Sequence, residues 1–105
     1  MTEPERRVEL QHKLENILGS NNVYFQPPET MKLNYPCIIY FKNAPLARYA
    51  NDAIYKRKQS YTVTVVDKNP DSELGYTISD SFQYCKIDSN YKSDNLNHTK
   101  LTLYY

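Results

Sequence analysis

The residues of this chain that could act as metal ligands or nucleophiles are few and far apart. It contains two histidines, His12 and His98, and two cysteines, Cys37 and Cys85. A zinc site or a metalloprotease helix needs such residues in close pairs, as in CxxC or HExxH, and neither spacing occurs. We interpret the histidines as surface or packing residues and the cysteines as small core residues in a reducing cytosol. A single disulfide bond between the two cysteines is kept as an alternative.

The acidic and glycine residues do not form a catalytic or phosphate-binding pattern either. Asp67, Asp71 and Glu73 gather where a helix is expected to begin, and capping of that helix explains them. The two glycines, Gly19 and Gly75, are too far apart to form a loop that cradles a phosphate. We therefore predict no catalytic residue, no cofactor and no metal, and we expect that the protein is not an enzyme.

The charge balance favours neither nucleic acid nor membrane as a partner for the chain as a whole. Its 105 residues carry 13 basic and 12 acidic side chains, which gives a net charge of +1. One basic run, residues 56–58, is flanked by Tyr49, Tyr55 and Tyr61. Because single-stranded nucleic acid binds to aromatic side chains beside basic ones, this class of partner is kept as an alternative. No stretch approaches the ~20 apolar residues of a membrane span.

Tyrosine is the residue whose abundance points towards a function. The chain has 11 Tyr, against 3 Phe and no Trp. Tyrosine combines a large apolar ring with a polar tip, which suits a surface that becomes buried on contact with another molecule. Tyrosine is also common in strands, where it packs within its own domain. The composition is thus consistent with a protein–protein contact surface or with ordinary strand packing.

Apolar spacing and turn signals predict two helices. Over residues 3–18, apolar side chains recur at helical spacing, and Gly19 follows as a stop signal. A second helix is predicted over about 70–80, because Asn69 is followed by Pro70 and then by two acids, as is typical of a helix start.

The remaining segments predict strands and one long connector. Apolar, β-branched or alternating runs predict strands over about 36–42, 59–67, 84–91 and 96–105. Residues 20–34 contain Pro27-Pro28 and are predicted to be a connector that packs through side chains instead of strand ladders. The order predicts a single α+β domain over residues 1–105, with a twisted, mostly antiparallel sheet of four to five strands and two helices packed on one face.

Several segments of the chain resemble a known family. YTVTVVDKNPDSE at residues 61–73 and DNLNHTKLTLYY at residues 94–105, with VYFQPPE and MKLNYPCIIY before them, resemble small tail-terminator (tail-completion) and neck proteins of long-tailed bacteriophages. The resemblance runs from the first helix to the last strand and rests on the order of the segments and on their amino-acid sequences. The family's fold, a twisted sheet flanked by two helices, matches the one predicted.

The resemblance implies a structural virion protein of the tail or neck, assembled in the host cytoplasm. It implies a homo-oligomeric ring of about six copies at the head-proximal end of the tail tube, which stops tube polymerisation. The implied partners are further copies of the chain, the tail tube protein and the head connector or stopper protein. DNA would pass through the ring without specific binding, and no membrane would be involved. A head-completion or neck adaptor protein is the alternative, followed by a small nucleic-acid-binding phage protein.

Such a ring needs contacts between its subunits. We predict that six residues take part in them: Tyr24, Pro27, Tyr49, Tyr55, Arg57 and Asp67. Tyrosine and proline suit such contacts because they lose little side-chain entropy on binding. The basic run around Arg57 is interpreted in three ways: a solvated edge, salt bridges to a neighbour's acids such as Asp67 or Asp71, or a channel wall near DNA. Phe25 is predicted to pack against its own sheet.

Overall fold

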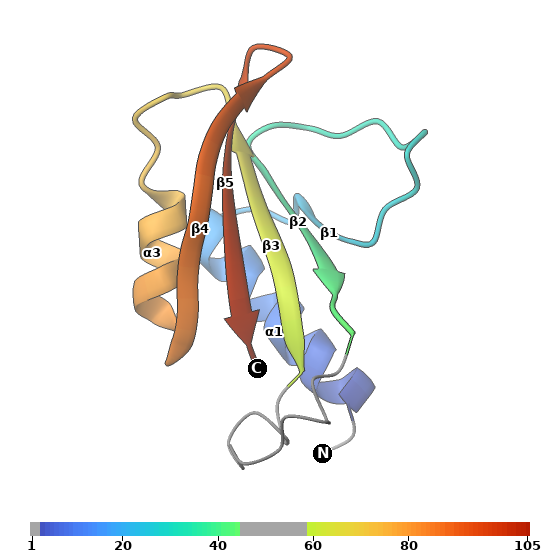
Figure 1. Ribbon diagram of the computed structural model, residues 1–105. Coiled ribbons are helices and arrows are strands. Elements are labelled where there is room, and N and C mark those ends of the chain that lie inside the picture. Colours follow the sequence, from blue (N-terminus) through green and yellow to red (C-terminus); the bar gives the residue numbers. More distant parts are fainter. Residues whose placement is uncertain (1–2, 45–58) are drawn as a thin grey trace.

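The computed structural model describes residues 3–44 and 59–105 as two helices and a five-stranded sheet (Figure 1). The elements are α1 Glu3–Leu18, β1 Val23–Phe25, β2 Cys37–Lys42, β3 Ser60–Asp67, α3 Leu74–Ser81, β4 Tyr84–Ser93 and β5 Leu96–Tyr104. The strand order is β1-β2-β3-β5-β4, with β1 parallel to β2 and all other neighbours antiparallel. This confirms the predicted α+β fold.

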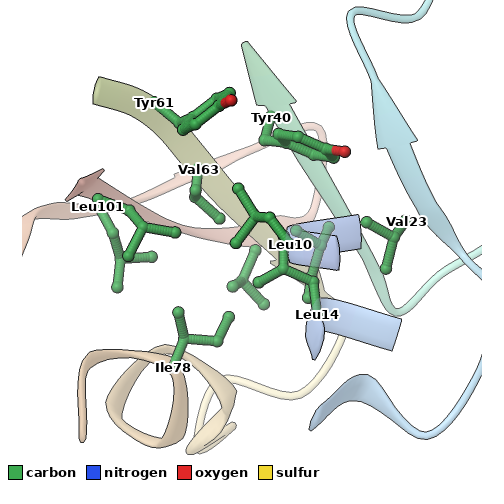
Figure 2. Packing of buried hydrophobic residues seen from close by; sticks show 11 residues of the cluster. Leu10, Leu14, Val23, Tyr40, Tyr61, Val63, Ile78 and Leu101 are labelled. Carbon is green, nitrogen blue, oxygen red and sulfur yellow. The ribbon is translucent and has the colours of Figure 1, made fainter. Parts of the chain in front are cut away.

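Both helices lie against the same face of the sheet, behind the strands in Figure 1. The core fills the space between the helices and this face, which we call the helix side (Figure 2). Its fully buried members come from both layers: Leu10, Leu14, Ile38, Tyr40, Val63, Ile78, Leu101 and Leu103. Burial of these side chains is the main favourable term that holds the helices on the sheet.

The first helix begins and ends where it was predicted. Leu10 and Leu14 are fully buried at a spacing of four residues, which places both on the side of α1 that faces the sheet. Gly19 ends the helix with a φ of 81°, a left-handed conformation that glycine adopts without a steric penalty. Its N–H group donates to the Glu15 carbonyl oxygen at 2.8 Å.

The predicted connector is wrong for three residues. Val23 pairs with Ile38 and Phe25 pairs with Tyr40, so residues 23–25 form a short parallel strand instead of a loop. Nothing local marks so short a strand, because its partner lies more than ten residues further along the chain. The Phe25 ring lies 5.0 Å from the Tyr40 ring between centroids, and this confirms that Phe25 packs on its own sheet.

The second helix starts later than predicted. It begins at Leu74, whereas the Asn69-Pro70 signal predicted a start near residue 70. Asn69 caps a turn instead: its N–H donates to Asp67 Oδ1 at 3.0 Å, and its Oδ1 accepts from the Asp71 N–H at 3.0 Å. These Asx turns compete with helix formation, so the segment before Leu74 stays a loop.

A partly buried polar network docks α1 on the first two strands. The Tyr40 hydroxyl donates to Gln11 Oε1 at 2.6 Å and accepts from Arg7 Nη1 at 3.2 Å. Gln11 Nε2 donates to the Val23 carbonyl oxygen at 2.8 Å. The Arg7 guanidinium also lies over the Phe25 ring, 4.4 Å from its centroid. Burial raises the pKa of Tyr40, which keeps its hydroxyl protonated and able to donate.

Replacing Tyr40 with Phe should therefore destabilise the fold. The change removes the hydroxyl that joins Gln11 to Arg7, and we expect the free energy of unfolding to fall by about 1–3 kcal/mol. Urea denaturation followed by circular dichroism measures this difference. The matched control is Tyr91→Phe, because Tyr91 is 48% exposed and its loss of a hydroxyl should change stability by less than about 0.5 kcal/mol. Equal effects of the two substitutions would contradict the network.

Gly75 allows α3 to lie close to β5. A Cβ atom at this position would lie 2.6 Å from Thr99 Cγ2, which is closer than packed carbon atoms come. Although alanine has a helix propensity about 1 kcal/mol better than glycine, we expect Gly75→Ala to lower the free energy of unfolding by about 1 kcal/mol net, because overpacking costs more.

The test for Gly75 is a double-mutant cycle with Thr99→Ser. This second change removes the Cγ2 methyl group, after which the nearest remaining atom to the new Cβ is at 3.3 Å. Thermal unfolding should show that Gly75→Ala is less harmful in the Thr99→Ser background than alone. Additive effects of the two changes would argue against the clash.

Candidate interaction surface

The face of the sheet turned away from the helices is not covered by either described helix (Figure 1). We call it the open face. Because side chains alternate along a strand, the positions between the buried core residues point to this face. Its main members are Tyr24, Ile39, Phe41, Thr62, Thr64, Lys86, Tyr91, His98, Lys100 and Thr102. Cys37 and Val66 point to the same face but are buried, so the face is covered around this pair.

The open face carries exposed aromatic side chains and a basic side. Phe41 on β2 is 44% exposed, and Tyr91 on β4 is 48% exposed. The basic side consists of Lys86 and Lys100, on the neighbouring strands β4 and β5. Within the described ranges, Lys100 has no ion pair, while Lys86 Nζ lies 3.9 Å from Asp88 Oδ1. Exposed aromatic side chains next to unpaired charge are suited to contact with another macromolecule.

A β-bulge places Tyr91 on this face. The pairing of β4 with β5 shifts between Ile87 and Ser89, which leaves Asp88 as the extra residue. Before the bulge, Cys85 and Ile87 contact the core on the helix side. After it, the alternation is reversed, so Tyr91 lies opposite His98 on the open face. Without the bulge, the Tyr91 side chain would point to the helix side.

His98 has a packing role beneath Tyr91. The two rings are stacked, with centroids 4.7 Å apart and an angle of 8° between their planes. His98 Nδ1 lies 3.1 Å from the Leu96 carbonyl oxygen, so the ring is held at both its face and its edge. The other histidine, His12, is exposed on α1. Within residues 3–44 and 59–105, no group of three or more His, Cys, Asp or Glu side chains lies together as a metal site would require.

The two cysteines are free thiols and cannot pair within one chain. Cys37 is on β2 and Cys85 is on β4, with β3 and β5 between them in the sheet. Burial raises the pKa of each thiol to about 11, and the negative charge of Asp88 contributes for Cys85. Both are therefore protonated at neutral pH, and protonated thiols are poor nucleophiles.

A hollow of about 320 Å³, lined by both polar and apolar groups, lies beside the start of α3. Its lining includes Asp67, Ser72, Tyr76, Lys92 and Asn97. The hollow is formed by the loop after β3, the first turn of α3 and the β4–β5 hairpin. Acidic, basic and amide groups are mixed in it, so it favours no single charge of ligand.

The structure separates the predicted interface residues. Tyr24 is half-buried on the open face of β1, and Pro27 follows this strand closely. Asp67 lies at the end of β3 on the helix side, where its carboxylate caps a turn, so it does not join them. Tyr49, Tyr55 and Arg57 lie outside the described residues.

Three contact candidates were missed in the sequence, namely Phe41, Tyr91 and Lys100. Strand alternation gives a signal for Lys100, since Lys100 and Thr102 alternate with the buried Leu101 and Leu103. It gives none for Tyr91, because the bulge changes the register. Phe41 stands at the end of a continuous apolar run, where alternation is hidden.

Comparison with known proteins gives no match, whether with protein family models, with curated proteins or with solved structures. The resemblance to phage tail-terminator and neck proteins therefore rests on the sequence segments alone. Neither α1 nor α3, the helices of the described part of the chain, is long and apolar enough to cross a membrane.

Both thiols should react slowly in the folded protein. With iodoacetamide at pH 7, we expect the native chain to gain mass much more slowly than the urea-denatured chain, which should gain two groups, because Cys37 is buried, Cys85 is partly buried and both thiols are protonated. Intact-mass spectrometry measures this directly. Rapid labelling of the native protein would contradict the burial of these groups.

The same pKa shift predicts a pH dependence of stability. The pKa of Cys37 rises from its ordinary value of 9.0 to about 11 in the fold, so the unfolded thiol ionises first. The free energy of unfolding should then fall as pH rises from about 9 to about 11. Cys37→Ala should reduce this fall, and an unchanged pH profile in that variant would count against the shift.

Proposed function

We propose that this chain is a structural virion protein that forms a ring at the head-proximal end of a phage tail tube. In this role it stops tube polymerisation and docks to the head connector, without catalysing a reaction. The observation that carries the proposal is the open face, which neither described helix covers, with Tyr91 exposed near Lys100 and Phe41 exposed farther away on β2. The assignment to a phage tail comes from the family resemblance. A head-completion or neck adaptor protein would use the same kind of surface.

The size of the chain supports assembly. A domain of 105 residues buries a smaller fraction of its surface than a larger protein does, so contacts between copies add stability that folding alone does not provide. Aromatic side chains with few rotatable bonds lose little entropy when they become buried in such contacts. The expected partners are other copies of the chain, the tail tube protein and the head connector or stopper protein.

The test is the native mass of the purified full chain, with negative-stain electron microscopy of the same sample. A closed ring of about six copies supports the proposal. Phe41→Ser should weaken assembly about tenfold or more, since buried aromatic anchors dominate interface energies. Val8→Ser is the matched control, because Val8 is 42% exposed on α1 and away from the open face. A monomer at every concentration, or equal effects of the two substitutions, would contradict the proposal.

A further inference from the structure

We infer that copies of this chain associate head to tail, with the exposed side of α3 in one copy docked on the open face of the next. The inference rests on the proposed function, because that function requires association between copies. It identifies the two surfaces and the charges that recognise each other. The surface, which we call the acidic stripe, consists of the N-cap residue Glu73 and of Tyr76, Thr77 and Asp80 on α3.

The acidic stripe is a single exposed side of α3. Its residues follow the spacing i, i+3, i+4 and i+7, which places them on one side of a helix. All four are exposed, and Tyr76 is 61% exposed, the highest value among the exposed large apolar and aromatic side chains of the described residues. The opposite side of the helix carries the buried Gly75 and Ile78. An exposed Tyr between two acids is a suitable anchor for a basic, partly aromatic surface.

The charges of the acidic stripe are not used in ion pairs among the described residues. In the described part of the chain, neither Glu73 nor Asp80 forms an ion pair, and α3 contains no basic residue. The other helix differs in this respect, because several of its charged groups are engaged. Arg6 and Lys13 lie over the Tyr105 ring at 5.5 and 5.0 Å, and the Tyr105 hydroxyl donates to the Glu9 carboxylate. The two acids of the acidic stripe are thus available to a partner.

The basic side of the open face matches the acidic stripe in sign and spacing. Lys86 pairs with Thr102, two residues from Lys100 on the neighbouring strand, so the two lysine Cα atoms lie roughly 8 Å apart. Seven residues of helix separate Glu73 from Asp80, which corresponds to about 10 Å. Lysine side chains are long enough to bridge this difference. The Lys86 side chain is 79% exposed and its nitrogen lies 3.9 Å from Asp88, so this weak pair leaves Lys86 able to contact a neighbour while Asp88 keeps its hydrogen bond from Thr102.

The positions of the two surfaces determine the type of assembly. The acidic stripe belongs to the helix layer and the open face lies on the other side of the sheet (Figure 1). One copy therefore presents both surfaces at the same time, in different directions. A contact between unlike surfaces is heterologous, and its repetition gives a closed ring or a filament instead of a two-fold dimer.

Charge reversal on each surface tests the inference. Lys100→Glu places a glutamate opposite the acidic stripe, and Asp80→Lys places a lysine opposite the basic side of the open face. We expect each variant alone to associate at least about tenfold more weakly than the wild type, because like charges then meet. Asp80→Lys adds a positive charge in the last turn of α3, where the helix dipole favours it, so loss of assembly would not reflect a weakened helix. Lys32→Glu, at an exposed connector position, is the control and should leave assembly unchanged.

Mixing the two variants tests whether Lys100 of one copy faces Asp80 of another. In an equimolar mixture, the introduced glutamate of one variant can meet the introduced lysine of the other, and the unchanged Lys100 can meet the unchanged Asp80. Sedimentation velocity should therefore show recovery of the wild-type assembly in the mixture and in the chain that carries both changes. Wild-type assembly should also weaken between about 0.15 and 1 M NaCl.

The outcomes distinguish this inference from the proposed function. Rings that persist in Lys100→Glu and Asp80→Lys would overturn the head-to-tail contact and leave the proposed ring intact. Loss of assembly in both variants without recovery on mixing would also overturn it, since the two charges would then not face each other. A wild-type chain that stays monomeric would overturn both proposals.

Discussion

The unequal burial of the two faces of the sheet, with the main core on the helix side, is the constraint on which the other features of this molecule depend. α1 and α3 cover the helix side, and the fully buried leucine, isoleucine and valine side chains of the core lie there. The chain offers no third helix in its described residues to cover the other face. Strand alternation then places a second set of side chains where they contact water or another molecule. The surface chemistry of the protein follows from this arrangement.

The edges of the sheet explain why the open face is the better surface for a partner. β1 has only three residues and is followed by Pro27 and Pro28, which lack the N–H groups that strand pairing requires. β4 is longer, but it is interrupted by the bulge at Asp88 and carries Lys86 and Lys92. Bulges, prolines and lysines are the usual features that prevent edge-to-edge pairing of sheets. Contacts through the face and the helices avoid these obstacles.

The sequence was sufficient for those parts of the fold that depend on local pattern. The first helix and the four longer strands were predicted because their apolar spacing is regular over many residues. The start of α3 was misplaced, since Asn69 can cap either a helix or a turn, and only the contacts around Asp67 decide between them. β1 was missed because its pairing with β2 is a tertiary contact. The ring, its virion partners and the role of Tyr24 and Pro27 stay predictions.

The distribution of charge links the subunit to the proposed conduit. A net charge of +1 gives the chain no general attraction for phosphate, and a channel through which DNA passes requires weak contacts. A net charge close to zero is compatible with charged surfaces of opposite sign, here exposed acids on the acidic stripe and exposed lysines on the open face. In the proposed ring, copies would attract each other through these complementary patches, and the charges in its contacts would neutralise each other. Specific contacts between subunits and weak binding to DNA are thus compatible in one small, nearly neutral chain.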